Sequence, residues 1–216
     1  MKRLMRFAVI LLALTAQSAF GSGGMKLPQS TPEQDAINSY NDGLRYRDRA
    51  WKYEQELATT QDSAQKAKLE DQIRKTYNAA VRCQSAAVRG NPTMYQAFSE
   101  LGYALRKSGN YPAALEAYDK SLSMQPNYGQ ALEYRAEAYL GLDRVNDAKT
   151  TYLMLFNGGD SKDAGLLAGA MAKWAADHKA NPGTVSAQTI DEFNTWLSQR
   201  KEISRDAPSA TTGSWR

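Results

Sequence analysis

The sequence has few of the side chains that most often perform chemistry. Its 216 residues include one cysteine, Cys83, and one histidine, His178. A single cysteine excludes an internal disulfide, and a catalytic triad needs a base matched to a nucleophile. The sequence has no His/Cys cluster, phosphate-binding loop or dinucleotide-binding glycine motif. We therefore predict no enzyme, no metal site and no cofactor.

The two reactive residue types are more readily explained by structure than by chemistry. Cys83 is expected to be a partly buried small residue, with a redox or dimerising thiol as the alternative. His178 is flanked by Asp177 and Lys179 and is expected to be a surface residue at a helix end.

Long hydrophobic runs are absent except near the N-terminus. The positive segment "MKRLMR" precedes the apolar run "FAVILLALTA", and small residues follow in "AQSAFGSGG". This order predicts a secretory signal peptide over residues 1–21, cleaved after Ser18 or Gly21. A retained membrane anchor is the alternative, but the run is shorter than the roughly 20 residues that span a bilayer. The prediction is a periplasmic or secreted bacterial protein without a membrane span after cleavage.

The chain also lacks an excess of charge of one sign. Loss of Lys2, Arg3 and Arg6 with the leader would reduce 27 basic residues to 24, against 23 acidic ones. The aromatic residues do not alternate with a basic stripe, as they do in many single-strand-binding proteins. We therefore expect no nucleic-acid partner.

Prolines are few, and two of them mark a repeat. At an offset of about 34 residues, a period typical of helix–turn–helix repeats, Pro92 falls on Pro126. Other side chains coincide in size and polarity at the same offset. The matching sets are Ala80, Ala114 and Ala148; Tyr77 and Tyr111; Tyr118 and Tyr152; Val88, Leu122 and Phe156.

Residues 95–128 carry the repeat pattern most completely. A first helix would hold the pattern residues Phe98, Leu101, Gly102 and Leu105, and a second would hold Tyr111, Ala114, Tyr118, Ser121 and Pro126. This stretch resembles a tetratricopeptide repeat, and residues 129–162 resemble a less regular copy. Gly109 is expected to end the first helix and Pro112 to begin the second. Gly102 and Ala114 should lie where the two helices cross closely.

The resemblance implies an all-α fold, a right-handed α–α superhelix of about three helical hairpins plus a closing hairpin. The expected segments are a linker at 22–34, repeats at 36–93, 95–128 and 129–162, a closing hairpin at 163–202, and a tail at 203–216. The linker and the tail are expected to be disordered. Gly165 and Gly169 in the closing hairpin suggest a tightly packed helix contact.

The first hairpin is longer than the repeat requires. Its additional length is charged and poor in large apolar residues. Two interpretations are open: solvated helix ends held by ion pairs at i,i+4, or a projecting arm that binds a partner.

Tetratricopeptide arrays commonly bind peptides or helices in a concave groove lined by their first helices. Transferred to this sequence, the resemblance implies a partner-binding groove of nine residues, although inter-repeat packing or plain solvation would also explain these side chains. They are Tyr40, Leu44, Arg47, Gln96, Tyr103, Arg106, Lys107, Tyr134 and Glu137.

The predicted function is a non-catalytic scaffold or adaptor in the bacterial envelope that binds a peptide or helix of another envelope protein. The alternative is a structural subunit of a pilus, secretion or cell-wall assembly, docked through the extended first hairpin. An enzyme with a pocket of carboxylates is a third and weaker hypothesis. Self-association through an exposed end face is a further expectation.

Overall fold

Eight helices make up most of the part of the chain that the structure, a computed structural model, describes. It describes residues 30–206, with side chains to residue 200, and the predicted signal peptide lies outside this range. The helices are α1 (Pro32–Thr59), α2 (Ser63–Gly90), α3 (Tyr95–Lys107), α4 (Tyr111–Met124), α5 (Gly129–Leu140), α6 (Val145–Asn157), α7 (Ser161–Ala180) and α8 (Ala187–Asp206). No strand occurs between residues 30 and 206. The all-α prediction is confirmed.

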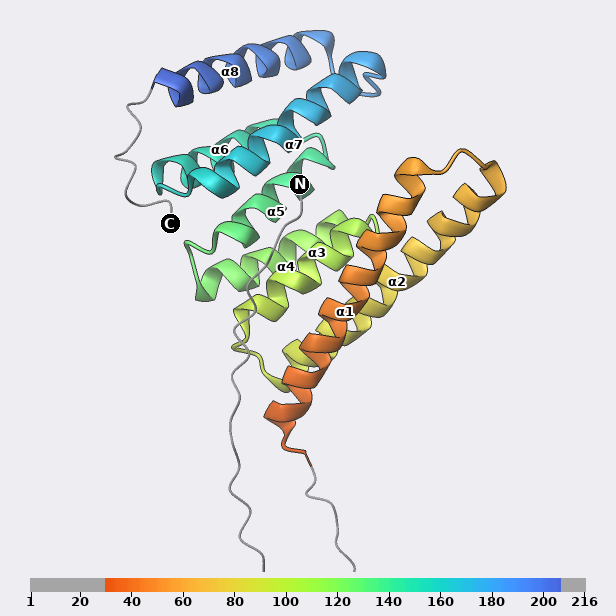
Figure 1. The fold of residues 1–216 in the computed structure, drawn as a ribbon. Coiled ribbons are helices and arrows are strands. Elements are labelled where there is room, and N and C mark those ends of the chain that lie inside the picture. The colour runs from red at the N-terminus through yellow and green to blue at the C-terminus, as the bar shows by residue number, and fades with distance from the viewer. Residues whose placement is uncertain (1–29, 207–216) are drawn as a thin grey trace, which may run out of the picture.

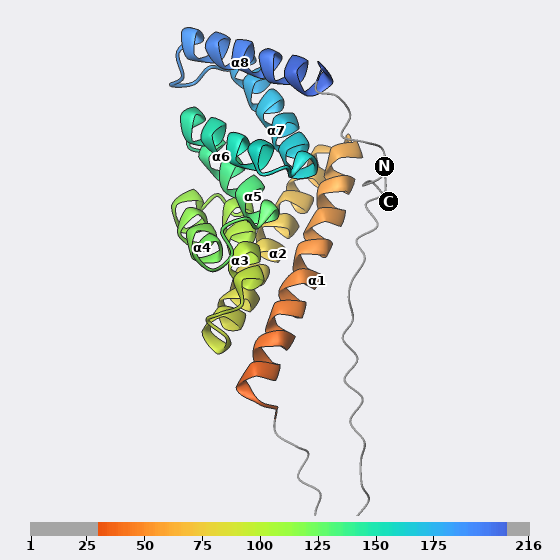
Figure 2. The ribbon, with the colours of Figure 1, turned by 90° about the vertical axis from the view of Figure 1, so that its left-hand side faces the viewer.

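The helices pack as four consecutive pairs, and each pair packs on the next. The closest partners are α1 with α2, α3 with α4, α5 with α6, and α7 with α8. Between pairs, α2 packs on α3, α4 on α5, and both α5 and α6 on α7. Figures 1 and 2 show this stepwise stack from the first hairpin to α8. The predicted array of helical hairpins is therefore present.

Short capped turns define the ends of the helices. The Asn110 side chain accepts a hydrogen bond from the backbone N–H of Ala113, and Pro112 lies in the first turn of α4. Gly109 has a φ of +82°, a left-handed conformation that favours glycine and stops α3. Both expectations for this turn are confirmed.

The helical array extends slightly beyond the predicted limits. It takes in residues 32–34 and 203–206, which the sequence analysis assigned to a linker and a tail. At the start, the Thr31 hydroxyl accepts the N–H of Gln34 at 3.1 Å, and Pro32 occupies the first turn. A capping threonine followed by proline is a strong helix start, which explains the earlier beginning.

Close crossing of α3 and α4 depends on a glycine. A Cβ on Gly102 would lie 2.5 Å from the Tyr118 ring, and Tyr118 is completely buried. Ala114 is also completely buried. The expectation of a close crossing at these residues is confirmed, because any larger residue at 102 would push the aromatic ring away.

The expectation for Gly165 and Gly169 is wrong. Both glycines are exposed, and a Cβ at either position would meet no atom within 4 Å. The reason is the orientation of α7, which turns Leu167, Met171 and Trp174 toward the core. At 3.6 residues per turn, the two glycines lie on the solvent side of that helix.

The first hairpin is the longest, with 28 residues in each helix. Its tip projects beyond α3 and α4 in Figure 1. In the half of α2 nearer the tip, Lys75 Nζ lies 2.7 Å from an oxygen of Asp71, an exposed i,i+4 ion pair. Within the described residues, no helix combines the length and apolar character that a bilayer span needs.

His178 is more than a surface residue at a helix end. Its ring stacks on Trp174 with centroids 4.0 Å apart, and its Nδ1 lies 3.0 Å from the Trp174 carbonyl oxygen. Its Nε2 lies 3.0 Å from Oδ1 of Asp143, in the turn between α5 and α6. The end of α7 lies against that turn, so His178 is half-buried and ties the closing hairpin to the third repeat.

Two glycine substitutions should change stability in opposite directions. Gly102→Ala should lower the free energy of unfolding by about 1–3 kcal/mol, because the added methyl group displaces the Tyr118 ring. Gly165→Ala should raise it by about 0.5–1 kcal/mol, because alanine favours a helix and the site is open. Chemical denaturation followed by circular dichroism measures both, and equal effects of the two variants would contradict the packing described.

Candidate functional site

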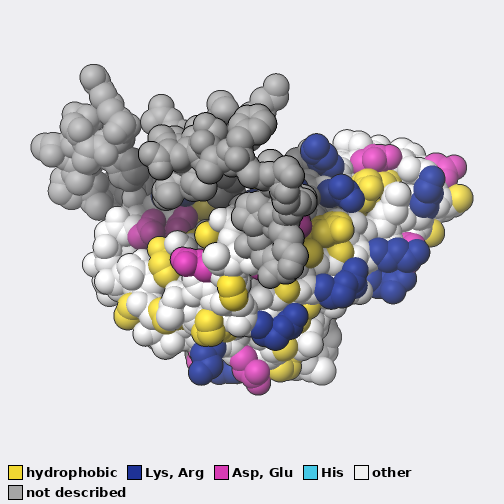
Figure 3. All heavy atoms as spheres, turned by 90° about the horizontal axis from the view of Figure 1, so that it is seen from below, with side chains coloured by type: hydrophobic (Ala, Val, Ile, Leu, Met, Phe, Trp, Pro, Cys, Tyr) yellow, Lys and Arg dark blue, Asp and Glu magenta, His cyan; other side chains and the backbone are white. Residues whose placement is uncertain are grey.

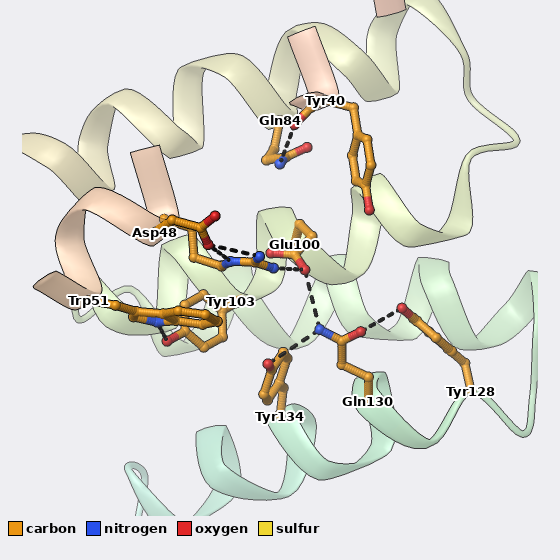
Figure 4. A network of polar contacts seen from close by, with 10 residues as sticks. Tyr40, Asp48, Trp51, Gln84, Glu100, Tyr103, Tyr128, Gln130 and Tyr134 are labelled. Atoms are coloured by element: carbon orange, nitrogen blue, oxygen red, sulfur yellow. Dashed lines mark hydrogen bonds and ion pairs between the residues drawn. The ribbon is translucent and has the colours of Figure 1, made fainter. Parts of the chain in front are cut away.

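The predicted groove residues come together on one side of three helices. They all lie on α1, α3 and α5, the first helices of three consecutive hairpins, and α3 contacts both of the others. We call the surface formed by these helices the first-helix face. Figure 4 shows part of it from close by.

A buried ion pair lies at the centre of this face. Arg47 Nη1 donates to Glu100 Oε1 at 2.6 Å, and the two side chains are only 3% and 6% exposed. Asp48 accepts from Nη2 of the same guanidinium at 3.0 Å. Together these three side chains carry one net negative charge.

Burial sets the ionisation of this pair. It raises the pKa of Glu100 more than the Arg47 guanidinium and the Gln130 amide lower it. Burial alone would lower the pKa of Arg47, but Glu100 and Asp48 outweigh that effect and the net pKa is raised. Each charge therefore depends on its partner for stability inside the protein.

A chain of hydrogen bonds continues from Glu100 to α5. Gln130 Nε2 donates to Glu100 Oε1 at 3.2 Å and lies 3.3 Å from the Tyr134 hydroxyl. The Tyr128 hydroxyl donates to Gln130 Oε1 at 2.6 Å. As Figure 4 shows, polar contacts run without a break from α1 through α3 to α5. Such a connected network favours one relative arrangement of the three hairpins.

Tyr103 is the centre of an aromatic cluster. Its ring centroid lies 6.0 Å from that of Trp51, 6.1 Å from Tyr77 and 4.7 Å from Tyr134. Trp51 Nε1 donates to the Tyr103 hydroxyl. Tyr103 is only 6% exposed, so most of its surface packs between repeats. Burial also raises the pKa of neighbouring Tyr77.

The other predicted cations have acidic partners within the chain. Arg106 Nη1 lies 2.5 Å from Glu137 Oε2, and its guanidinium stands over the Tyr103 and Tyr134 rings. Lys107 Nζ lies 2.6 Å from Glu54 Oε1. These contacts cross from α3 to α5 and from α3 to α1, so both ion pairs also join repeats.

The nine predicted residues thus divide into two groups. Arg47, Tyr103 and Tyr134 are buried, and the Arg106 side chain is only 13% exposed. The remaining five are half-buried and form the accessible part of the face: Tyr40, Leu44, Gln96, Lys107 and Glu137. Burial and the nearby Glu100 carboxylate raise the pKa of Tyr40 to about 12, so its hydroxyl stays neutral and can donate hydrogen bonds.

The residues that contact these side chains were not predicted from the sequence. Trp51, Asp48 and Glu54 were not identified as parts of the face. One signal was available, because Trp51 lies one helical turn after Arg47 and stands under its guanidinium at 4.5 Å.

The described part of the chain shows little that could perform chemistry. Between residues 30 and 200, no three His, Cys, Asp or Glu side chains are grouped so that they could hold a metal ion. Cys83 is half-buried, as expected. Burial and the Asp42 carboxylate raise the pKa of its thiol, which disfavours the reactive thiolate.

Removing one partner of the buried ion pair should destabilise the stack. Arg47→Ala should lower the free energy of unfolding by about 3–5 kcal/mol, because Glu100 is left buried and unpaired. Arg45→Ala is the matched control, since its ion pair with Asp42 is exposed and should contribute less than about 1 kcal/mol. Urea denaturation provides the comparison, and equal losses in both variants would contradict the assignment.

The same variant should acquire a specific pH dependence. A carboxyl with a raised pKa in the folded state binds more protons there than in the unfolded chain, so stability falls as pH rises through the interval between the two values. In the folded protein Arg47 lowers the pKa of Glu100 and so keeps it closer to its value in the unfolded chain. Removal of Arg47 should raise the folded-state pKa and widen the interval between the two values. The destabilisation of Arg47→Ala should therefore be greater near pH 8 than near pH 5. A loss independent of pH would contradict this account.

The comparison with known families agrees with this geometry. The family model described as the tetratricopeptide repeat matches residues 95–128, which contain α3 and α4. Domains built of this repeat are typically non-catalytic. The repeat suggests a scaffold for protein–protein interaction.

Proposed function

We propose that the protein is a non-catalytic scaffold that binds a segment of another protein along the first-helix face. The observation that carries the proposal is the continuity of this face across three hairpins, one of which matches the tetratricopeptide repeat. A continuous face of stacked first helices offers a long, shaped surface to an extended peptide or a helix.

The internal ion pairs support this proposal by making the face rigid. Side chains such as Arg47 and Glu100 are already held in one arrangement. Binding therefore costs less conformational entropy than it would on a mobile surface. The half-buried Tyr40 and Leu44 supply apolar contact area, and the ion-paired Lys107 and Glu137 supply polar contacts beside them.

We further propose that the protein acts in the bacterial cell envelope, with another envelope protein as its partner. This proposal rests on the leader-like pattern of residues 1–21 and on the single cysteine. Cell fractionation with N-terminal sequencing tests it. The expected product is a periplasmic or secreted chain that begins at Ala19 or Ser22, and an uncleaved chain in the cytoplasm would contradict it.

A pair of accessible substitutions tests the binding face. The partner is recovered from an envelope extract, identified by mass spectrometry and purified. Calorimetry then compares the wild type with Tyr40→Ala/Leu44→Ala. Loss of two accessible contact residues on the α1 side of the face should weaken binding by about tenfold or more.

The control removes apolar surface elsewhere. Met154→Ala on α6 truncates a side chain that is 46% exposed and lies outside the first-helix face. It should leave affinity unchanged, and circular dichroism should show native helicity in every variant. Unchanged affinity of Tyr40→Ala/Leu44→Ala would place the partner elsewhere on the molecule.

A further inference from the structure

One side of the first hairpin has no neighbour within residues 30–206. The hairpin packs on α3 through one side, chiefly by contacts of α2 with α3. The opposite side ends the stack in Figures 1 and 2. In a repeat array every hairpin buries its two sides against neighbours, except at the ends. The side turned away from α3 is therefore open to a partner, and we call it the outer face.

The centre of the outer face is aromatic and apolar. Arg47 and Trp51 of α1 contact α3, and at 3.6 residues per turn Tyr46 and Tyr53 lie on the far side of that helix. Both tyrosines are half-buried. On α2, Cys83 is half-buried and close enough to Asp42 of α1 for that carboxylate to raise the pKa of its thiol, which places it on the side of α2 next to the Asp42 turn of α1.

Basic side chains line both edges of this centre. Arg49 and Lys52 on α1 are exposed, and Arg82 and Arg89 on α2 are exposed. Among residues 30–200 none of these four has an acidic partner, whereas the exposed Arg45 is paired with Asp42. Arg49 stands over the Tyr46 ring at 5.5 Å. Figure 3 shows Lys and Arg side chains gathered over this part of the molecule, with hydrophobic side chains between them.

We propose that the outer face binds an amphipathic helix of a partner protein that has an apolar stripe and acidic residues on both sides of it. The apolar stripe would cover Tyr46 and Tyr53, and the carboxylates would pair with the cations at the edges. A helix laid in a groove between two helices is a common mode of recognition, and complementary charges fix its position.

The chemistry of this face favours a protein over a polyanion. Nucleic acids and anionic membranes are recognised mainly through a dense positive surface. Here the four free cations stand in two rows, separated by tyrosine rings and by the Asp42 carboxylate. The α2 cations Arg82 and Arg89 lie two turns apart, which matches acidic residues spaced two turns apart on a partner helix.

This site is separate from the first-helix face. Tyr46 and Arg49 take no part in the network of Arg47 and Glu100. A protein with both surfaces can hold two partners at once, so it would bridge them. The outer face does not depend on the function proposed for the first-helix face, and either can fail alone.

The test uses a designed acidic amphipathic helix as the probe. The peptide carries leucines along one side and glutamates on both flanks, and a control peptide replaces every glutamate with lysine. Fluorescence anisotropy measures binding of each to the purified protein at low and at high salt. The acidic peptide should bind, more weakly at high salt, and the lysine peptide should not bind.

Charge reversal locates the binding surface. Arg49→Glu/Arg82→Glu should weaken binding of the acidic peptide by about tenfold or more. Lys173→Glu/Lys179→Glu changes the same amount of charge at exposed positions on α7 and should change affinity by less than about twofold. All four positions are exposed, so the variants should keep native helicity.

Four results would overturn the proposal. The first is failure of the acidic peptide to bind, and the second is an equal loss of affinity in both charge-reversal variants. The third is tighter binding of a DNA oligonucleotide or of phosphatidylglycerol vesicles than of the peptide, and the fourth is self-association through this face. The last would appear in sedimentation velocity as a dimer that Arg49→Glu/Arg82→Glu abolishes, and the occupant would then be a second copy of the chain.

Discussion

Between residues 30 and 206 the hairpins bury their apolar side chains largely against one another, and this constraint governs the architecture. Tyr103 belongs to the second hairpin, yet it reaches 6% exposure only because Trp51 and Tyr77 cover it from the first and Tyr134 from the third. Burial of aromatic rings is among the largest favourable contributions to folding. The stack is therefore held together by contacts between successive repeats, and a repeat without its neighbour would expose much of its core.

The polar network adds specificity to this apolar packing. Arg47, Glu100 and Gln130 place buried charges and an amide between three hairpins. A buried ion pair seldom adds much net stability, but a misplaced one is costly because both charges lose their hydration. The packing of the hairpins that satisfies all three groups is thus favoured over packings in which one helix is shifted along another. The same network occupies much of the first-helix face, so a partner meets a preformed surface and not a set of free charges.

The sequence predicted the helices well and their contacts poorly. Period and spacing identified the close crossing at Gly102, because repeated small residues mark positions that helix packing constrains. The same rule failed at Gly165, since spacing shows that two small residues share a side of a helix but not whether that side meets another helix. The partners of Arg47 and Tyr103 lie about fifty positions away, and only the stacking of hairpins brings them together. Their burial therefore became visible only in three dimensions.

The most direct test of coupling between repeats is amide hydrogen exchange of the wild type and of Phe193→Ala, which creates a cavity in the closing hairpin at a completely buried side chain. The account predicts a graded response: protection is lost in α7 and α8, falls less in α5 and α6, and is nearly unchanged in α1 and α2. Equal loss of protection in all eight helices would show that the chain unfolds as one cooperative globule. That result would contradict the claim that each hairpin depends chiefly on its neighbours.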